Sequence, residues 1–340
     1  MTAGAVLPWR AGVSTGVGSM PGEDPYSSLR VVLEDCPDLV FLPELPARGP
    51  GAGLIGRGAA LLVDMPVDLQ PSGWRFVDRP GLDARRAHDL LSRDLDAAEE
   101  LLAGYTGLLK VQATGPWTLA AGVELNRGDK ALADPGACRD LAESLAEGVR
   151  RLAADVVHRV PGATVLLQLD EPSLPAVLLG RVRTASGFGA LAAVEEPAAE
   201  SVLKLVLGAA GVPGVAHCCA QRPPIALLHR SGAQALSLDA GQLSAADDEA
   251  IGEAVEAGAG LLLGVLPGTD SPMSDLPTTL APVRAMWRRL GFDPELLGRT
   301  VVLTPSCGLA GASPAYSRAA LARCREAARA LAEDPEATGG

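Results

Sequence analysis

The segment "GVAHCCAQRPP" (214–224) concentrates side chains that bind metal ions. His217, Cys218 and Cys219 are adjacent there, although the 340-residue chain holds only four histidines and six cysteines. Side chains along a β-strand alternate between its two faces, so we expect His217 and Cys219 to share one face and Cys218 to point into packing. Imidazole and thiolate groups are common zinc ligands. The spacing therefore predicts part of a zinc site.

Two more potential ligands end other apolar segments. Asp239 falls in "AQALSLDAG" (233–241), and Cys307 falls in "TVVLTPSCG" (300–308). Together with His217 and Cys219 they would form a tetrahedral set of four ligands. Two thiolates favour zinc over magnesium. Asp239 has an alternative role as the cap of the helix that follows it.

Carboxylates also follow predicted strands. Asp170 and Glu171 are adjacent in "ATVLLQLDEP" (163–172), and Glu44 ends "LVFLPEL" (39–45). We expect one of the adjacent pair to face the site and the other a neighbouring loop or helix. An inward carboxylate can bind a substrate ammonium or act as a general base. Capping or ion pairing is the alternative for this pair.

Strands and helices must bring these residues together. Eight apolar segments alternate with amphipathic helical segments, which predicts an α/β fold, a (β/α)8 TIM barrel of one domain. Its active site would lie at the carboxyl ends of the strands. A doubly wound sheet is the alternative, but "GVGSMPG" (16–22) lacks the glycine spacing of a dinucleotide loop. The strands are predicted at 12–19, 39–45, 108–116, 163–172, 214–219, 233–241, 260–268 and 300–308.

The remaining segments complete the predicted organisation. Residues 1–335 form the barrel, the Gly/Pro-rich segment 46–80 is a loop insertion, and 336–340 is a disordered tail. Helices are predicted at 25–36, 82–105, 134–160, 194–210, 220–231, 244–258, 276–291 and 314–333. Cys36, Cys138 and Cys324 fall in these helices and are interpreted as small buried hydrophobic residues.

Composition excludes several classes of partner and location. The net charge of −12 disfavours nucleic acid and anionic membranes. No apolar run approaches the roughly 20 residues of a membrane span, and no signal peptide is recognisable. Six cysteines in a chain of this length do not indicate a disulfide scaffold. We therefore expect a cytoplasmic protein.

The motifs, taken in order, resemble a known family. The chain is similar to the C-terminal, catalytic half of cobalamin-independent methionine synthase, in the barrel superfamily that includes uroporphyrinogen decarboxylase. The matching motifs are "VGSMP" (17–21), "ATGPWT" (113–118), "QLDEP" (168–172), "HCC" (217–219) and "TPSCGL" (304–309).

The resemblance implies a function and a set of site residues. It implies that Zn2+ binds the thiol of homocysteine, with His217, Cys219 and Cys307 as ligands. The family's remaining ligand is a glutamate, at about the position of Asp239. Substrate contacts carry over to Val17, Gly18 and Ser19 for the carboxylate, to Asp170 for the amino group, and to Glu44. Asp170 is thereby the candidate catalytic residue.

Departures from the family pattern concern the methyl donor. The chain has no room for the family's large N-terminal half. A tryptophan that stacks on the folate falls at Gly122, and a folate-linked glutamate falls at Ala176. The resemblance is thus closest to the short core type, which takes methyl from methylcobalamin or a corrinoid protein. It implies a zinc-dependent thiol methyltransferase that converts homocysteine to methionine.

Two other functions stay open. A non-catalytic zinc- or thiol-binding barrel would keep the ligands and lack turnover. A uroporphyrinogen decarboxylase-like enzyme would need arginines to bind several substrate carboxylates, and the predicted strand ends carry cysteines and carboxylates instead.

Overall fold

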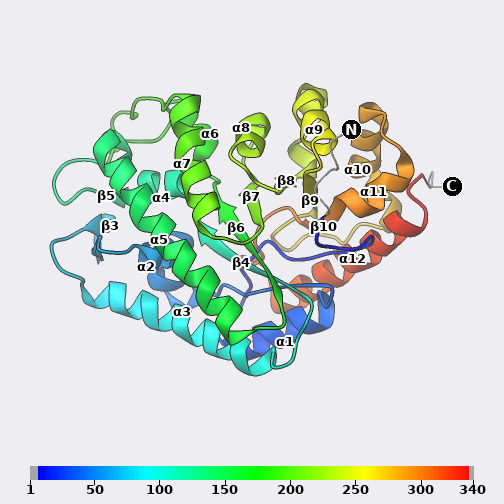
Figure 1. The fold of residues 1–340 in the computed structure, drawn as a ribbon, viewed down its shortest axis with the longest axis horizontal. Coiled ribbons are helices and arrows are strands. Elements are labelled where there is room, and N and C mark those ends of the chain that lie inside the picture. The colour runs from blue at the N-terminus through cyan, green and yellow to red at the C-terminus, as the bar shows by residue number, and fades with distance from the viewer. Residues whose placement is uncertain (1–6, 337–340) are drawn as a thin grey trace.

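Seven parallel strands form one curled sheet at the centre of the molecule (Figure 1). The computed structural model describes residues 7–336. The strand order is β1–β4–β6–β7–β8–β9–β10, and each strand pairs in parallel with its neighbours. The bounds are β1 Leu39–Phe41, β4 Leu108–Thr114, β6 Thr164–Asp170, β7 Gly214–Cys218, β8 Ala235–Asp239, β9 Gly260–Leu266 and β10 Val301–Pro305.

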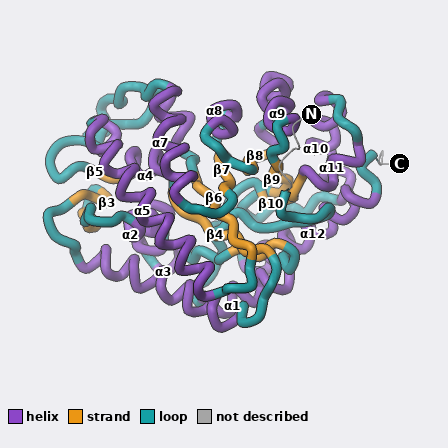
Figure 2. The backbone as a smooth tube through the Cα atoms, viewed as in Figure 1, coloured by secondary structure: helices purple, strands orange, loops and turns teal. Residues whose placement is uncertain are grey.

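Helices surround this sheet (Figure 2). Their apolar faces pack on it and form the main core, which is the arrangement expected for amphipathic helices that connect parallel strands. Every predicted helix is present. The helices are α1 Pro25–Asp35, α2 Leu54–Leu61, α3 Leu82–Leu101, α4 Pro116–Gly122, α5 Pro135–Arg159, α6 Leu174–Leu178, α7 Glu196–Ala209, α8 Ile225–Arg230, α9 Asp248–Glu256, α10 Leu276–Leu290, α11 Pro294–Thr300 and α12 Pro314–Glu333. Within residues 7–336, none is long and apolar enough to cross a bilayer.

The prediction of a closed eight-stranded barrel requires correction. The α/β class and the single domain are confirmed, but the predicted strand 12–19 is not a regular strand. It lies between β10 and β1 and makes only isolated bridges, from Ser14 to Leu303 and from Ser19 to Glu44. Glycine weakens strands, and a Cβ built at Gly16 would lie 2.4 Å from the Phe41 ring. The sheet is therefore a half-barrel of seven strands.

The segment 46–80, predicted as a loop insertion, contains regular structure. It includes α2 and the antiparallel pair β2 Val67–Gln70 and β3 Gly73–Phe76. β5 Val123–Glu124 adds to β3 and completes a second, three-stranded sheet. The predicted tail begins at Glu336, and its residues 337–340 lie outside the described part of the chain.

The concave face of the curled sheet has an apolar floor and a polar upper layer. The floor is a separate cluster that includes Trp9, Val13, Leu39, Leu166, Val215, Ala235, Leu262 and Val302. Two residues further along β6 and β7, the same face carries Gln168 and His217, both buried. The side chains thus change from apolar to polar toward the carboxyl ends of the strands, where a site is expected.

Candidate active site

A cavity of about 160 Å³ lies at the carboxyl ends of the strands. It brings together eight of the nine residues predicted for the site, from segments that are far apart in the sequence. The predicted residues that line it are Val17, Gly18, Ser19, Glu44, Asp170, His217, Cys219 and Cys307. Asp239 does not line it. Cys218 is fully buried, as the alternation of strand faces predicts.

Two thiols and an imidazole form one wall of the cavity. Cys219 Sγ and Cys307 Sγ are 3.5 Å apart, although 88 residues separate them in sequence. His217 Nδ1 is 2.9 Å from Ser237 Oγ, which leaves Nε2 as the ring nitrogen available to a ligand. The Cys219 thiol and the His217 ring lower the pKa of Cys307 to about 4, and the pKa of Cys219 is raised. The contact between the two sulfurs is the main cause of both shifts.

This donor set fits a zinc ion in chemistry and in sulfur spacing. Two thiolates at about 2.3 Å from a tetrahedral zinc are expected to lie roughly 3.8 Å apart. The observed 3.5 Å separation is close to that value. Within residues 7–336, however, no three His, Cys, Asp or Glu side chains are already grouped closely enough to hold a metal ion. The sulfur pair is therefore preformed, whereas the complete ligand set is not.

Asp239 makes a different contact. Its Oδ1 accepts a hydrogen bond of 2.9 Å from the Gly241 backbone N–H, so it caps the 3-10 turn Ala240–Gln242. Its side chain is half-buried, and burial raises its pKa. A ligand role for Asp239 would require its carboxylate to turn away from Gly241.

Two buried carboxylates, Asp170 and Glu44, also line the cavity, and Asp170 lies beside His217 on the neighbouring strand. Asp170 Oδ1 accepts a hydrogen bond of 2.7 Å from Gln168 Nε2. Burial raises the pKa of Asp170, and His217, the Gln168 hydrogen bond and Lys110 oppose that rise. Burial raises the pKa of Glu44 to about 7 against the opposing charge of Arg57, whose Nε lies 3.1 Å from Glu44 Oε1. A substrate ammonium would meet both carboxylates in this cavity.

Sequence reasoning missed the buried charged residues next to Glu44 and Asp170. Arg57, which pairs with Glu44, also contacts Asp94 at 2.5 Å, and Asp94 contacts Arg48 at 2.8 Å. These four buried side chains thus comprise two acidic and two basic groups. The Lys110 side chain is fully buried below the cavity. Burial lowers the pKa of Lys110 to about 7, against the attraction of Asp170 and Glu44. The signal available in the sequence was a single lysine inside the apolar strand "LLKVQAT".

Glu171 points away from the cavity. Its carboxylate accepts hydrogen bonds from Trp117 N at 2.9 Å, Thr118 N at 2.8 Å and Thr118 Oγ1 at 2.7 Å. These contacts cap the first turn of α4, whose N–H groups have no partner within the helix. A Cβ at Gly115 would lie 2.4 Å from this carboxylate. The motifs "LDEP" and "ATGPWT" are thus complementary parts of one contact.

Gly122 and Ala176 are the two positions at which the sequence departs from the family's folate-binding residues. A Cβ at Gly122, at the end of α4, would lie 2.5 Å from Ile55 Cδ1. A tryptophan at this position has no space unless Ile55 moves. Ala176 lies in the short helix α6.

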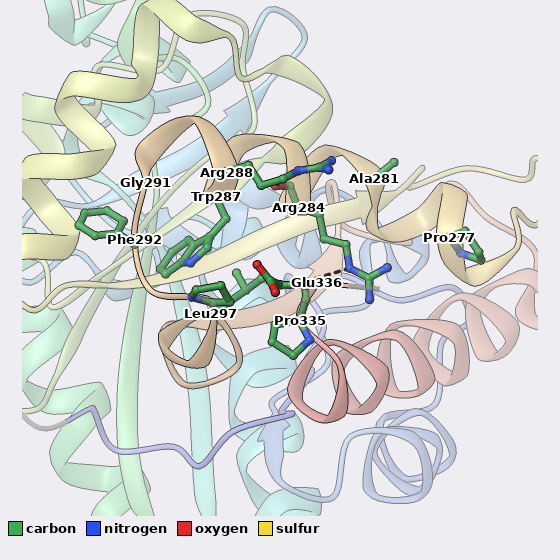
Figure 3. Close-up of a pocket in the computed structure, with 11 residues that line it drawn as sticks. Pro277, Ala281, Arg284, Trp287, Arg288, Gly291, Phe292, Leu297, Pro335 and Glu336 are labelled. Atoms are coloured by element: carbon green, nitrogen blue, oxygen red, sulfur yellow. Dashed lines mark hydrogen bonds between the residues drawn. The ribbon is translucent and has the colours of Figure 1, made fainter. Parts of the chain in front are cut away.

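A larger pocket of about 690 Å³ lies outside the sheet, beside α10 and α11 (Figure 3). Arg284 points across it and donates to the carbonyls of Pro335 at 3.2 Å and Asp334 at 2.7 Å. Trp287 packs against Phe292 with ring centroids 5.3 Å apart. No histidine or cysteine lines this pocket, whereas His217, Cys219 and Cys307 line the smaller cavity.

Comparison with known families identifies the class of protein. Residues 13–330 match the model of the family described as "Cobalamin-independent synthase, Catalytic domain", and the chain belongs to this family. The resemblance seen in the motifs is therefore confirmed. No curated protein sequence matches the chain.

One solved structure supports the same fold. A B12-independent methionine synthase from Shewanella sp. W3-18-1, in complex with selenomethionine, matches with a TM-score of 0.58 and 12% identity, covering 97% of this chain and 99% of that one. At this identity the likeness concerns the fold alone. A putative lyase/mutase from Burkholderia cenocepacia J2315 covers 96% of this chain and 88% of its own at 16% identity, with a TM-score of only 0.38.

Proposed function

We propose that this protein is a methyltransferase that transfers a methyl group to the thiol of homocysteine and so forms methionine. The observation that carries the proposal is that one cavity is lined by the Cys219–Cys307 sulfur pair, His217 and two buried carboxylates. Family membership supports the reaction class. The cavity volume of about 160 Å³ suits a small amino acid.

The proposed metal ligands are His217, Cys219 and Cys307. Three protein ligands leave one tetrahedral position for the substrate, as in catalytic zinc sites. When bound, zinc would stabilise the substrate sulfur as a thiolate at neutral pH. Asp239, the fourth ligand predicted from the sequence, is left out of this proposed set because its carboxylate accepts a hydrogen bond from Gly241.

The proposed contacts of the amino-acid part come from the two carboxylates and the backbone that line the cavity. Asp170 and Glu44 bind the substrate ammonium, and Asp170 keeps Oδ2 available because Gln168 occupies Oδ1. Within residues 7–336, the backbone N–H groups of Gly18 and Ser19 have no hydrogen-bond partner, so they can donate to the substrate carboxylate. These contacts would orient the sulfur toward the methyl donor.

The methyl donor is the finer part of the proposal. Gly122 stands where the family has a folate-stacking tryptophan, and Ile55 leaves no space for that side chain. The corrinoid donor predicted from the sequence finds no support, since the family is described as cobalamin-independent. We therefore propose the thiol acceptor and leave the donor to a direct assay.

The assay measures methionine formation by the zinc-loaded protein with L-homocysteine and either 5-methyltetrahydrofolate or methylcobalamin. Methionine with either donor supports the proposal and identifies the donor. Absence of homocysteine binding, measured by calorimetry, would contradict the methyltransferase proposal. Zinc and thiol binding without turnover with either donor would favour the non-catalytic barrel.

A further inference from the structure

The fully buried Lys110 has a set of contacts that the proposed reaction does not use. Its Nζ donates to Val17 O at 2.7 Å and to Gln168 Oε1 at 2.8 Å. In the amide orientation that satisfies Gln112, Nζ also donates to the Gln112 oxygen at 2.9 Å. A neutral amine has two N–H donors and an ammonium has three. Three acceptors around one nitrogen therefore fit a charged Lys110.

The ammonium determines which way the Gln168 amide points. Because Lys110 offers only donors, the Gln168 oxygen must face it. The Gln168 nitrogen is then directed to Asp170 Oδ1 at 2.7 Å and to Val17 O at 2.9 Å. A flipped amide would place its oxygen against the Asp170 carboxylate and the Val17 carbonyl, where no donor exists.

The same contacts determine the orientation of the peptide between Val17 and Gly18. Val17 O accepts hydrogen bonds from both Lys110 and Gln168, which lie below the cavity. In a trans peptide the C=O and the next N–H point in opposite directions. The Gly18 N–H is thereby directed away from Lys110, toward the cavity that Gly18 lines.

We infer that Lys110 is a positioning residue that orients both ends of the amino-acid site, Asp170 through Gln168 and the Gly18 N–H through the Val17 carbonyl. The inference rests on the proposed function, because it concerns the same substrate. Lys110 touches neither the proposed metal ligands nor the reacting sulfur. Its loss should weaken recognition of the amino-acid part and leave thiol binding to zinc intact.

The test compares four thiols by calorimetry on zinc-loaded protein. L-homocysteine carries both polar groups, 4-sulfanylbutanoate lacks the amino group, 3-aminopropane-1-thiol lacks the carboxylate, and 1-propanethiol lacks both. Lys110→Met should lower the preference for homocysteine over propanethiol by tenfold or more, since each misplaced charge-assisted hydrogen bond contributes about that factor. Both singly truncated thiols should also lose their advantage over propanethiol. Zinc content and propanethiol affinity should match the wild type.

A second variant covers the case in which Lys110→Met does not fold. Gln168→Met keeps the ammonium and its contact with Val17 but removes the contact with Asp170. It should reduce the advantage of 3-aminopropane-1-thiol more than that of 4-sulfanylbutanoate. If either variant folds and keeps the wild-type preference among the four thiols, the inference about Lys110 is overturned. The proposed function would then be unaffected. A wild type that does not prefer homocysteine to propanethiol would overturn the proposed function and this inference with it.

Discussion

At the scale of single residues, the two wall cysteines have different surroundings from the other four. Cys219 and Cys307 line the cavity and face each other, whereas Cys36, Cys138, Cys218 and Cys324 are buried. Burial raises the pKa of Cys36 to about 12 and that of Cys138 to about 11, which keeps these thiols protonated and inert. Cys219 and Cys307 are therefore the two thiols that line the cavity.

We predict that Cys219→Ser and Cys307→Ser each abolish zinc retention. A serine hydroxyl is a far weaker zinc ligand than a thiolate, so zinc should fall from about one ion per chain to near zero after dialysis. Metal analysis by mass spectrometry measures this. Cys138→Ser is the matched control and should retain zinc at the wild-type level. Retention in either wall variant would refute the assignment of that ligand.

Asp239 allows a separate test of the fourth ligand. Asp239→Asn should keep both the cap on Gly241 and the zinc, because asparagine is an effective capping residue. Asp239→Ala should also keep the zinc but lose the cap, at a cost of about 1 kcal/mol in the free energy of unfolding. Zinc analysis and chemical denaturation distinguish these effects. Loss of zinc in both variants would make Asp239 a ligand.

At the scale of elements, helix α4 is stabilised by a carboxylate that follows strand β6. Glu171, the residue after β6, caps the first turn of α4. The neighbouring Asp170 faces the cavity instead. Asp170 thus lines the cavity while Glu171 stabilises α4, because adjacent side chains along a strand point in opposite directions.

We predict that Glu171→Gln destabilises the protein by about 1–3 kcal/mol, because a buried N–H loses its acceptor. The amide can present one oxygen to Trp117 and Thr118, and its NH2 group then faces a donor. Chemical denaturation measures the loss. Glu253→Gln, at an exposed position of α9, is the control and should leave the midpoint almost unchanged. An equal midpoint in both variants would show that the cap does not contribute to stability.

At the scale of the whole molecule, the seam is the place where β10 and β1 would meet in a closed barrel. It decides where the backbone that we propose to bind the substrate carboxylate lies. Residues 13–20 span the seam through Thr15 N to Leu303 O at 3.0 Å and Met20 N to Glu44 O at 2.8 Å. This segment carries Val17, Gly18 and Ser19 into the cavity. Its few bridges and its glycines allow it to follow a path that a regular eighth strand would not.

We predict that Gly16→Ala shifts this segment, because its Cβ would clash with Phe41. The expected destabilisation is about 1–3 kcal/mol, with weaker homocysteine binding and unchanged zinc content. Gly208→Ala in α7 is the matched control: its Cβ meets no atom within 4 Å, and alanine should stabilise the helix by about 0.5–1 kcal/mol. Thermal unfolding and calorimetry measure both. Wild-type behaviour of Gly16→Ala would show that the seam tolerates the added methyl group.

The sequence by itself determined the α/β class, the seven strands of the main sheet, eight of the twelve helices within residues 7–336 and the family. Apolar periodicity and capping residues are local signals, so "LLKVQATGP" and "GVAHCC" predict strands without knowledge of the fold. Alternation of faces also separated Cys219 from Cys218. The segment 46–80 was misread as a loop because short elements rich in glycine and proline leave little periodic signal.

Only the tertiary structure decided which side chains meet. The 3.5 Å contact of Cys219 with Cys307, the Arg57–Asp94 pair and the position of Lys110 below Asp170 depend on register and helix packing. The irregular segment at 12–19 also follows from that packing. Residue type determines what chemistry is available, whereas the distance between residues far apart in sequence is set by how the whole chain packs.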